Sequence, residues 1–244
     1  MYKTISTNDG SNTLYSSQYN QHYHNINDGA IFETLTKHVI PAITFHKNRH
    51  ELNILDICYG LGYNTLGTLY YLKTNNLKIK VNIYSPELNK KLVKSLKDFD
   101  YPKEFSNLKH IIKCISEDLY YKDEQIEIKV FFKDARVLLK DLNIKFDVIY
   151  QDAFSSEVNN ELWTKEYFSL LYNLCNDDSI ITTYSVATPV RLSMYEAGFY
   201  IYEYIPYKRK QTLAFKKQQN LLGKYVDMEL KKTRNPSAKA LYDR

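Results

Sequence analysis

Cysteine is scarce in this chain of 244 residues, and no apolar run is long. Cys58, Cys114 and Cys175 stand far apart, with no CxxC motif and no paired histidine spacing, which argues against a disulfide framework or a metal site. We expect buried free thiols. The apolar runs fall well short of the ~18 residues that span a membrane, and the start, MYKTISTNDG, lacks the pattern of a signal peptide. A cytoplasmic protein without a metal or membrane partner is expected.

The composition that is present, with 44% hydrophobic and 25% charged residues, is typical of a globular protein. The length favours one substantial core rather than two catalytic domains. The net charge of +5 is unevenly distributed. Residues 208–244 hold 11 Lys and Arg against 3 Asp and Glu, a net +8, whereas the preceding residues carry −3. This basic segment predicts either an anionic macromolecular partner or a solvated, frayed tail.

From residue 51 onward, apolar runs rich in β-branched residues alternate with helix-like segments, which is typical of a doubly wound α/β fold. The pattern predicts strands over residues 52–58, 79–85, 126–132, 146–152 and 179–184. It predicts helices over residues 64–73, 89–99, 135–142, 161–174 and 188–197. FYIYEYI and KRKQTLAFK are interpreted as an antiparallel hairpin ending a sheet of about seven strands.

Residues 1–50 do not follow this alternation. The polar and aromatic stretch DGSNTLYSSQYNQHYHN precedes a helix-like stretch, GAIFETLTKHVIPAI, which is expected to end near Pro41. The apolar content is too small for a separate core. We therefore expect an N-terminal extension or lid over residues 1–50, a main domain over 51–216 and a basic C-terminal segment over 217–244.

The first motif is the stretch LDICYGLGYNT, residues 55–65, where a strand ends and a helix begins. Gly60 and Gly62 allow a tight turn and a close approach of a ligand to the backbone. Glu87 ends the next predicted strand, where a carboxylate can accept both hydroxyls of a ribose. Together they indicate a nucleotide-type cofactor. The alternatives are a tight turn without a ligand and a carboxylate that complements a helix dipole.

Two further acids follow predicted strands. Asp134, in FFKDARVLL, is suited to contact an adenine amino group, to cap the next helix, or to do both. Asp152, in YQDAFSSEVNNELW, is followed by Phe154 at the strand edge where ligands bind. A carboxylate there can hold an amine and stabilise its developing charge, and the aromatic ring can shape a dry site for a sulfonium. The alternative for Asp152 is a turn cap.

These motifs, together with DGS-TLYS, TYS-AT-VR, EAGF and KR---LAF in the same order, span Asn8 to Phe215. On these residues the chain resembles the methyltransferase domain of MnmC-type tRNA 5-methylaminomethyl-2-thiouridine biosynthesis proteins, in its stand-alone form. The resemblance implies a Rossmann-like, seven-stranded fold that uses S-adenosylmethionine, with the methyltransferase domain over residues 51–216. The implied reaction is N-methylation of the 5-aminomethyl group of the tRNA wobble uridine. Fused members carry a flavin-dependent oxidase, so here a separate enzyme is expected to supply the aminomethyl group, unless the oxidative step is unnecessary.

The resemblance also implies a role for each matching residue. Asp152 would be catalytic, and it would bind the cofactor together with Gly60, Gly62, Asn64, Glu87 and Asp134. The substrate-binding residues would be Tyr15, Tyr23, His24, Glu33, Phe154, Arg191, Lys208 and Arg209. The sequence departs from the pattern at Cys58, where many methyltransferases carry glycine.

Two other functions fit the same motifs. An aminopropyltransferase or small-amine methyltransferase shares the sheet and both acids, but a polyamine calls for several carboxylates, and the next acid after Asp152 is Glu157. A non-catalytic tRNA-binding protein is the second alternative, and it would bind S-adenosylmethionine weakly or not at all. For the methyltransferase, Asp152 is too weak a base to deprotonate an alkylamine fully, so a positioning and charge-stabilising role is expected.

Overall fold

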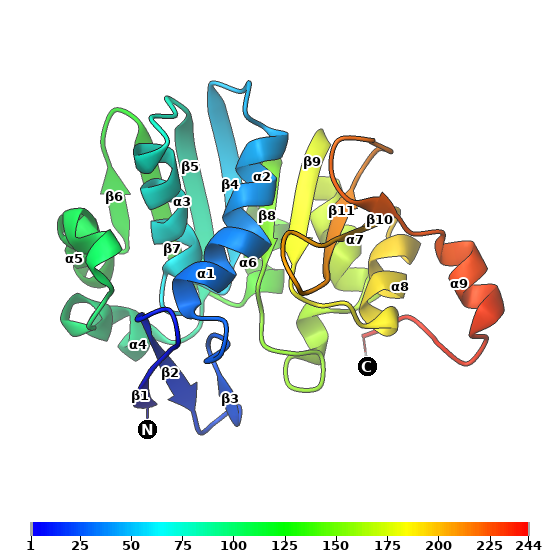
Figure 1. Cartoon of the computed structure of the whole chain (residues 1–244), viewed down its shortest axis with the longest axis horizontal. Helices are drawn as coiled ribbons and strands as arrows, with labels where there is room; N and C mark the ends of the chain where they lie inside the picture. Colours follow the sequence, from blue (N-terminus) through cyan, green and yellow to red (C-terminus); the bar gives the residue numbers. More distant parts are fainter. Residues whose placement is uncertain (1, 244) are drawn as a thin grey trace.

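One large β-sheet organises the computed structural model, which describes residues 2–243 (Figure 1). Its strands are β4 (Glu51–Ile57), β5 (Lys80–Glu87), β6 (Tyr120–Lys122), β7 (Ile126–Phe132), β8 (Phe146–Gln151), β9 (Cys175–Thr183), β10 (Tyr200–Tyr204), β11 (Gln211–Phe215) and β12 (Lys224–Tyr225). Within the described residues these nine strands follow the order β12-β10-β11-β9-β8-β4-β5-β7-β6. The central strands β9, β8, β4, β5 and β7 are parallel, and antiparallel strands complete both edges.

The α/β architecture predicted from the sequence is confirmed. The five central strands lie within a few residues of their predicted positions, and β10 and β11 form the expected antiparallel pair. The sheet is wider than the expected seven strands because β6 and β12 add short edges of 3 and 2 residues. Strands this short contain too few residues to show an alternating pattern.

Helices pack on both faces of the sheet (Figure 1). Because side chains alternate along a strand, Ile54 enters one cluster of buried apolar side chains and its neighbour Leu55 enters the other. The first cluster includes side chains from α3 (Tyr63–Thr74), α4 (Lys90–Ser95) and α5 (Lys109–Asp118). The second includes side chains from α6 (Ala135–Asp141), α7 (Lys165–Leu174) and α8 (Thr188–Glu196). The sequence pattern did not predict α5.

The N-terminal segment packs along the carboxyl ends of the parallel strands (Figure 1). Within the described residues it forms a small three-stranded sheet of β1 (Tyr2–Ser6), β2 (Asn12–Ser16) and β3 (Gln21–His22). Tyr63 on α3 donates its hydroxyl to the carbonyl of Asn12 at 2.7 Å, and Gln21 donates to Ser155 Oγ at 2.7 Å. These bonds join the small sheet to the loops that follow β4 and β8.

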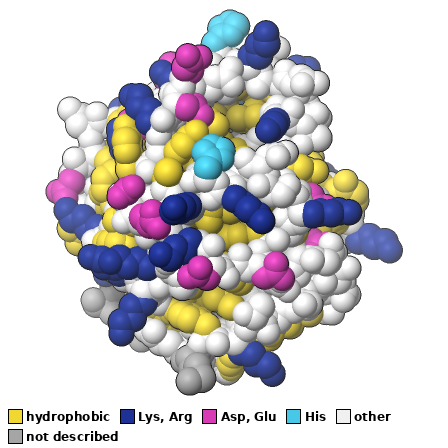
Figure 2. Space-filling view, turned by 90° about the vertical axis from the view of Figure 1, so that its left-hand side faces the viewer, with side chains coloured by type: hydrophobic (Ala, Val, Ile, Leu, Met, Phe, Trp, Pro, Cys, Tyr) yellow, Lys and Arg dark blue, Asp and Glu magenta, His cyan; other side chains and the backbone are white. Residues whose placement is uncertain are grey.

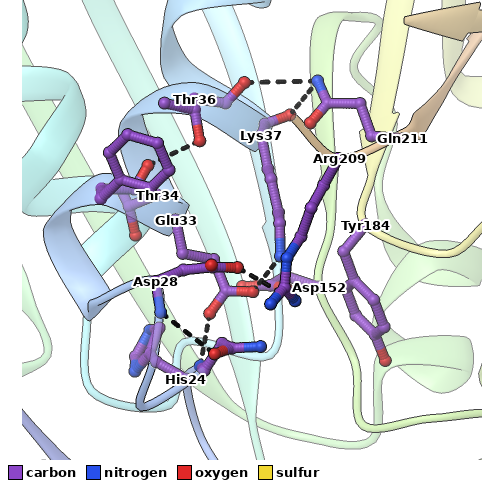
Figure 3. Close-up of polar contacts among 12 residues, drawn as sticks. His24, Asp28, Glu33, Thr34, Thr36, Lys37, Asp152, Tyr184, Arg209 and Gln211 are labelled. Atoms are coloured by element: carbon purple, nitrogen blue, oxygen red, sulfur yellow. Dashed lines mark hydrogen bonds and ion pairs between the residues drawn. The ribbon is translucent and has the colours of Figure 1, made fainter. Parts of the chain in front are cut away.

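A helical run continues past Pro41, so the prediction that it ends there is wrong. The run consists of α1 (Ala30–Thr34), a π-helical turn over Leu35–Val39 and α2 (Ile40–Phe45). Pro41 has no N–H to donate to carbonyls one turn earlier, a loss that normally weakens a helix. Here Gln211 on β11 donates its side-chain amide to the carbonyls of Thr36 and Lys37, each at 3.3 Å (Figure 3). A side chain from the sheet therefore supplies the bonds that Pro41 cannot make.

The C-terminal residues are packed on the domain, so the frayed-tail alternative is wrong for the part that the structure describes. β12 pairs with β10, and Met228, at the start of α9 (Met228–Arg234), is only 1% exposed. Lys165 donates its N–H to the carbonyl of Leu241 at 2.8 Å. Several cations of this region already form ion pairs, including Lys217 with Asp177 and Lys232 with Glu196.

Lysines and acids are interspersed on the face that includes the β6 edge (Figure 2). Lys122 and Lys129 both pair with Glu127, and Lys97 on this side pairs with Glu117. This face therefore lacks the single-sign charge that would attract a polyanion. Among residues 2–243, no helix combines the length and apolar character that crossing a membrane requires.

Candidate active site

A cavity of about 1260 Å³ opens where the parallel strands end. It is larger than the ~300–1,000 Å³ of most small-molecule sites, which leaves room for a cofactor and part of a second substrate. The turns after β4, β5, β7 and β8 line it, and residues 18–27 of the N-terminal segment cover it. Ligands bind at this edge of open α/β sheets.

The glycine turn after β4 forms part of the cavity wall. Gly60 and Gly62 have φ angles of +53° and +73°, a conformation that favours glycine. A Cβ on Gly60 would lie 3.3 Å from the ring of Tyr23, whereas a Cβ on Gly62 would lie 2.8 Å from the ring of Tyr59. Gly60 lines the cavity, while Gly62 allows the turn to pack on Tyr59 and is absent from the lining.

Cys58 adopts the backbone conformation of a glycine although it carries a side chain. Its φ is +66°, in the left-handed region that costs an ordinary residue ~1–2 kcal/mol. The turn thus keeps its shape at the position where the sequence departs from the methyltransferase pattern. Burial raises the pKa of the thiol well above its ordinary value, so Cys58 stays protonated.

Glu87 and Asp134 both line the cavity at strand ends. Glu87 accepts the N–H of Gly60 at 2.8 Å and that of Asn89 at 2.7 Å, so it connects the ends of β4 and β5. Burial raises the pKa of Glu87 despite these bonds. Asp134 is the N-cap of α6 and accepts the N–H of Arg136 at 2.9 Å, so the helix-capping interpretation applies to it.

Asp152 follows β8 and lines the centre of the cavity. Asn64 donates its amide to Asp152 Oδ2 at 2.9 Å, and His38 Nε2 lies 3.3 Å from Asp152 Oδ1. Burial alone would raise the pKa of Asp152, but the contacts with His38 and Asn64 outweigh it and hold the pKa below its ordinary value. Both oxygens are therefore held in place, and the carboxylate is ionised at neutral pH.

Buried polar side chains hold the two partners of Asp152 in turn. Asn64 accepts the hydroxyl of Thr34 at 3.1 Å, and His38 Nδ1 is 2.8 Å from Thr182 Oγ1 on β9. Asn64 also contacts Asp56, whose pKa burial raises to about 7. His38 is fully buried, and sequence reasoning missed it. The only sequence signal was a histidine within a helix-like stretch.

Charged side chains gather beside Asp152 (Figure 3). Lys37 pairs with Glu33 one turn earlier in the helical run. Arg209, on the loop between β10 and β11, pairs with Asp28 at 3.2 Å. Tyr184 lies near these groups, with Lys37 Nζ 5.8 Å from the centre of its ring.

The structure brings most predicted substrate residues to this cavity. Its lining includes Tyr23, His24, Glu33, Phe154 and Arg209. The ring of Phe154 lies 5.0 Å from that of Tyr23, which forms an aromatic wall beside the glycine turn. Burial lowers the pKa of His24, so this imidazole is neutral at pH 7.

Three predicted substrate residues lie elsewhere. Tyr15 contacts Asn20 within the N-terminal sheet, and Lys208 is exposed at the tip of the hairpin; neither lines the cavity. Arg191 is only 2% exposed and donates to Thr212 Oγ1 at 2.8 Å. The predicted contact of Arg191 with substrate is therefore corrected: its guanidinium is buried and forms a hydrogen bond to the sheet.

An α/β sheet with a cavity at the carboxyl ends of its parallel strands is found in several classes of enzyme, and similarity to known proteins identifies the class here. Residues 102–217 match a family model described as S-adenosyl-L-methionine-dependent methyltransferase. The protein is a methyltransferase of this class, with S-adenosylmethionine as its cofactor. The crystal structure of MnmC2 from Aquifex aeolicus matches with a TM-score of 0.86 and 32% identity, covering 100% of this chain and 79% of that one. The chain belongs to the MnmC2 methyltransferase family.

Curated relatives match this chain over part of their own length. An uncharacterised protein of Methanocaldococcus jannaschii is 29% identical over 218 residues, which are 87% of this chain and 59% of the relative. The tRNA 5-methylaminomethyl-2-thiouridine biosynthesis bifunctional protein MnmC of Campylobacter hominis is 28% identical over 160 residues, 63% of this chain and 23% of the relative. The chain thus spans less than two thirds of the length of either relative.

Proposed function

We propose that this protein transfers a methyl group from S-adenosylmethionine to the primary amine of a 5-aminomethyl group on the wobble uridine of tRNA. The observation that carries the proposal is Asp152, an ionised carboxylate held by Asn64 and His38 beside a glycine turn. The similarity to proteins named for 5-methylaminomethyl-2-thiouridine biosynthesis supports the choice of acceptor.

We assign the cofactor to the residues along the strand ends. Gly60 lines the cavity, and its missing side chain lets the ring of Tyr23 lie close to the backbone, so we assign the methionine part to the space beside this turn. Each oxygen of Glu87 accepts one backbone N–H, and a carboxylate oxygen has a further lone pair that can accept a ribose hydroxyl. We assign Asp134, which lines the cavity at the end of β7, to the adenine amino group. In this assignment Asn64 contributes to cofactor binding by holding Asp152, and Gly62 contributes by allowing the shape of the turn.

The chemistry sets the role of Asp152. S-adenosylmethionine supplies an electrophilic methyl group when bound. The attacking amine must be neutral, yet an alkylamine has a pKa near ~10 and is mostly protonated at pH 7. Asp152, with its lowered pKa, cannot remove that proton fully. It instead orients the amine and stabilises the positive charge that develops on nitrogen, and the proton is lost to water.

His38 is a positioning residue in this scheme. It is buried against Thr182 and contacts the oxygen of Asp152 that Asn64 does not hold. With both oxygens held, the carboxylate needs little reorganisation as charge develops on the amine. The N-terminal segment therefore supplies a part of the site that the strand ends alone would lack.

Nucleoside analysis of tRNA tests the proposed reaction. In a strain that lacks the gene, mass spectrometry of digested tRNA should show 5-aminomethyluridine forms in place of their methylated products. A plasmid copy of the gene should restore the products, and a copy with Asp152→Asn should not. An unchanged wobble-nucleoside profile in the deletion strain would overturn the proposal.

A further inference from the structure

An ion pair on the acceptor side of the cavity retains unused hydrogen-bonding capacity. Glu33 contacts Lys37 Nζ through Oε1 and accepts the N–H of Asn25 at 2.7 Å through Oε2. Both side chains line the cavity and are 13% exposed. A carboxylate has about four acceptor positions and an ammonium has three donors. The pair can therefore present an acceptor and a donor, side by side, to a ligand.

The pair lies close to Asp152. Glu33, Lys37 and Asp152 point into the same part of the cavity, with Tyr184 beside them (Figure 3). Burial raises the pKa of Tyr184, and the charges of Asp152 and Glu33 raise it further. An amine held by Asp152 would thus bring the ring that carries it toward Glu33 and Lys37.

The edge of a uracil ring matches this arrangement. The aminomethyl group is attached to C5, the neighbouring C4 carries an acceptor oxygen, and the next ring atom, N3, carries a hydrogen. Uracil therefore presents an acceptor and then a donor. Cytosine presents the reverse, because its C4 carries a donor amino group and its N3 is an acceptor. Enzymes that act on an extruded base read this edge by hydrogen bonds and stack the ring on aromatic side chains.

We propose that Lys37 and Glu33 form a subsite that reads the O4 and N3–H edge of the acceptor base. Lys37 donates to O4, Glu33 accepts from N3–H, and Tyr184 provides the face on which the ring rests. The subsite therefore selects a base of the uracil type over cytosine as the carrier of the aminomethyl group. This inference rests on the proposed function and assigns its base specificity.

The nearby ion pair of Arg209 is suited to another role. The Arg209 side chain is 56% exposed, compared with 13% for Lys37, so water competes for its hydrogen bonds. Exposed guanidinium groups are suited to phosphates, which position a nucleic acid without reading its bases. Glu33 and Lys37 are largely shielded from water, and hydrogen bonds discriminate best between bases in such a position.

Synthetic anticodon stem-loops can test the subsite directly. One carries 5-aminomethyluridine at the wobble position, and the other carries 5-aminomethylcytidine. Single-turnover transfer of labelled methyl from S-adenosylmethionine should be at least ~30-fold faster for the uridine substrate with the wild-type protein. Glu33→Gln and Lys37→Met should each slow the uridine reaction by about 10- to 100-fold, the range for one hydrogen bond to a charged group. The uridine preference should fall to about threefold or less.

Glu51→Gln is the matched control, because Glu51 pairs with Lys80 at 3.2 Å on the surface, outside the cavity lining. It should keep both the rate and the preference. Calorimetry should show S-adenosylmethionine affinity within about twofold of wild type for every variant, which verifies folding. Equal wild-type rates on both RNAs, or an unchanged preference in both cavity variants, would overturn the inference and leave the proposed function intact. Failure of the cofactor-binding wild type to methylate either RNA would overturn both.

Discussion

At the scale of single residues, the site depends on how a buried carboxylate is kept ionised. Asp152 and Asp56 lie on neighbouring strands and both contact Asn64, yet their pKa values shift in opposite directions. Burial raises the pKa of both acids, but the contacts of Asp152 with His38 and Asn64 outweigh its burial, whereas the hydrogen bonds to Asp56 do not. One network thus contains an acid that is ionised at neutral pH and a second acid that takes up a proton near neutral pH.

Asp152→Asn should abolish most turnover without loss of the cofactor. The amide keeps the size of the side chain but removes the charge that stabilises the developing ammonium, so the single-turnover rate should fall at least ~100-fold, about 2.7 kcal/mol. Asp141→Asn is the matched control, since Asp141 is exposed and pairs with Lys133. A rate within threefold of wild type on aminomethyl-bearing tRNA would contradict the catalytic assignment.

Asp56→Asn should change how stability depends on pH. The folded-state pKa of Asp56 is raised to about 7, above the ordinary 3.8, so folding favours its protonated form. Its contribution to stability is complete below pH ~4 and is lost as the pH rises through about 7. The melting temperature of the variant relative to wild type should therefore be higher at pH 8.5 than at pH 5, by at least ~2 °C. Calorimetry at the two pH values measures this, and an equal difference at both would contradict the assignment.

At the scale of elements, the helical run over residues 30–45 contributes Glu33, Lys37 and His38 to the site. Its π-helical turn contains both Lys37 and His38, and such turns occur often at functional sites. The turn is tolerated because β11 provides Gln211 as a donor to its free carbonyls. The π-helical turn before Pro41 thus brings His38, a residue of the N-terminal segment, into contact with Asp152.

Gln211→Leu should weaken this element. Gln211 is 1% exposed, and leucine has a similar volume but cannot donate to the carbonyls of Thr36 and Lys37. Two buried acceptors lose their partner, so the free energy of unfolding in urea should fall by ~1–3 kcal/mol, and methyl transfer should slow with it. Gln125→Leu, at an exposed loop position, should change neither quantity. Wild-type stability in the Gln211 variant would show that the carbonyls do not need this donor.

At the scale of the whole molecule, the charge on the outer surface is less concentrated than the composition suggests. Many of the C-terminal cations pair with acids, such as Lys217 with Asp177 at the opposite edge of the sheet from the cavity. Arg209 differs from Lys217 because it lines the cavity, where it forms an ion pair with Asp28 of the N-terminal segment. An approaching phosphate would compete with Asp28 for this guanidinium, so we expect Arg209 to contribute to RNA binding.

Arg209→Gln should therefore reduce the salt dependence of tRNA affinity. Removing one phosphate contact lowers the slope of log affinity against log salt by about 0.7–0.9 and weakens binding most at low salt. Filter binding over a range of KCl concentrations measures the slope. Lys217→Gln should leave the slope unchanged, and identical slopes for the two variants would contradict the assignment of Arg209.

The sequence by itself determined the sheet, the glycine turn and the positions of Glu87, Asp134 and Asp152. Each of these follows from a local pattern, because a parallel strand that ends in a turn must place its last side chains at one edge. Only the tertiary structure decided that His38 and Lys37 lie beside Asp152, that Gln211 sustains the helix around Pro41, and that Arg191 is buried. Those contacts join residues that are distant in the chain, and a local sequence pattern does not indicate which distant side chains will meet in the folded protein.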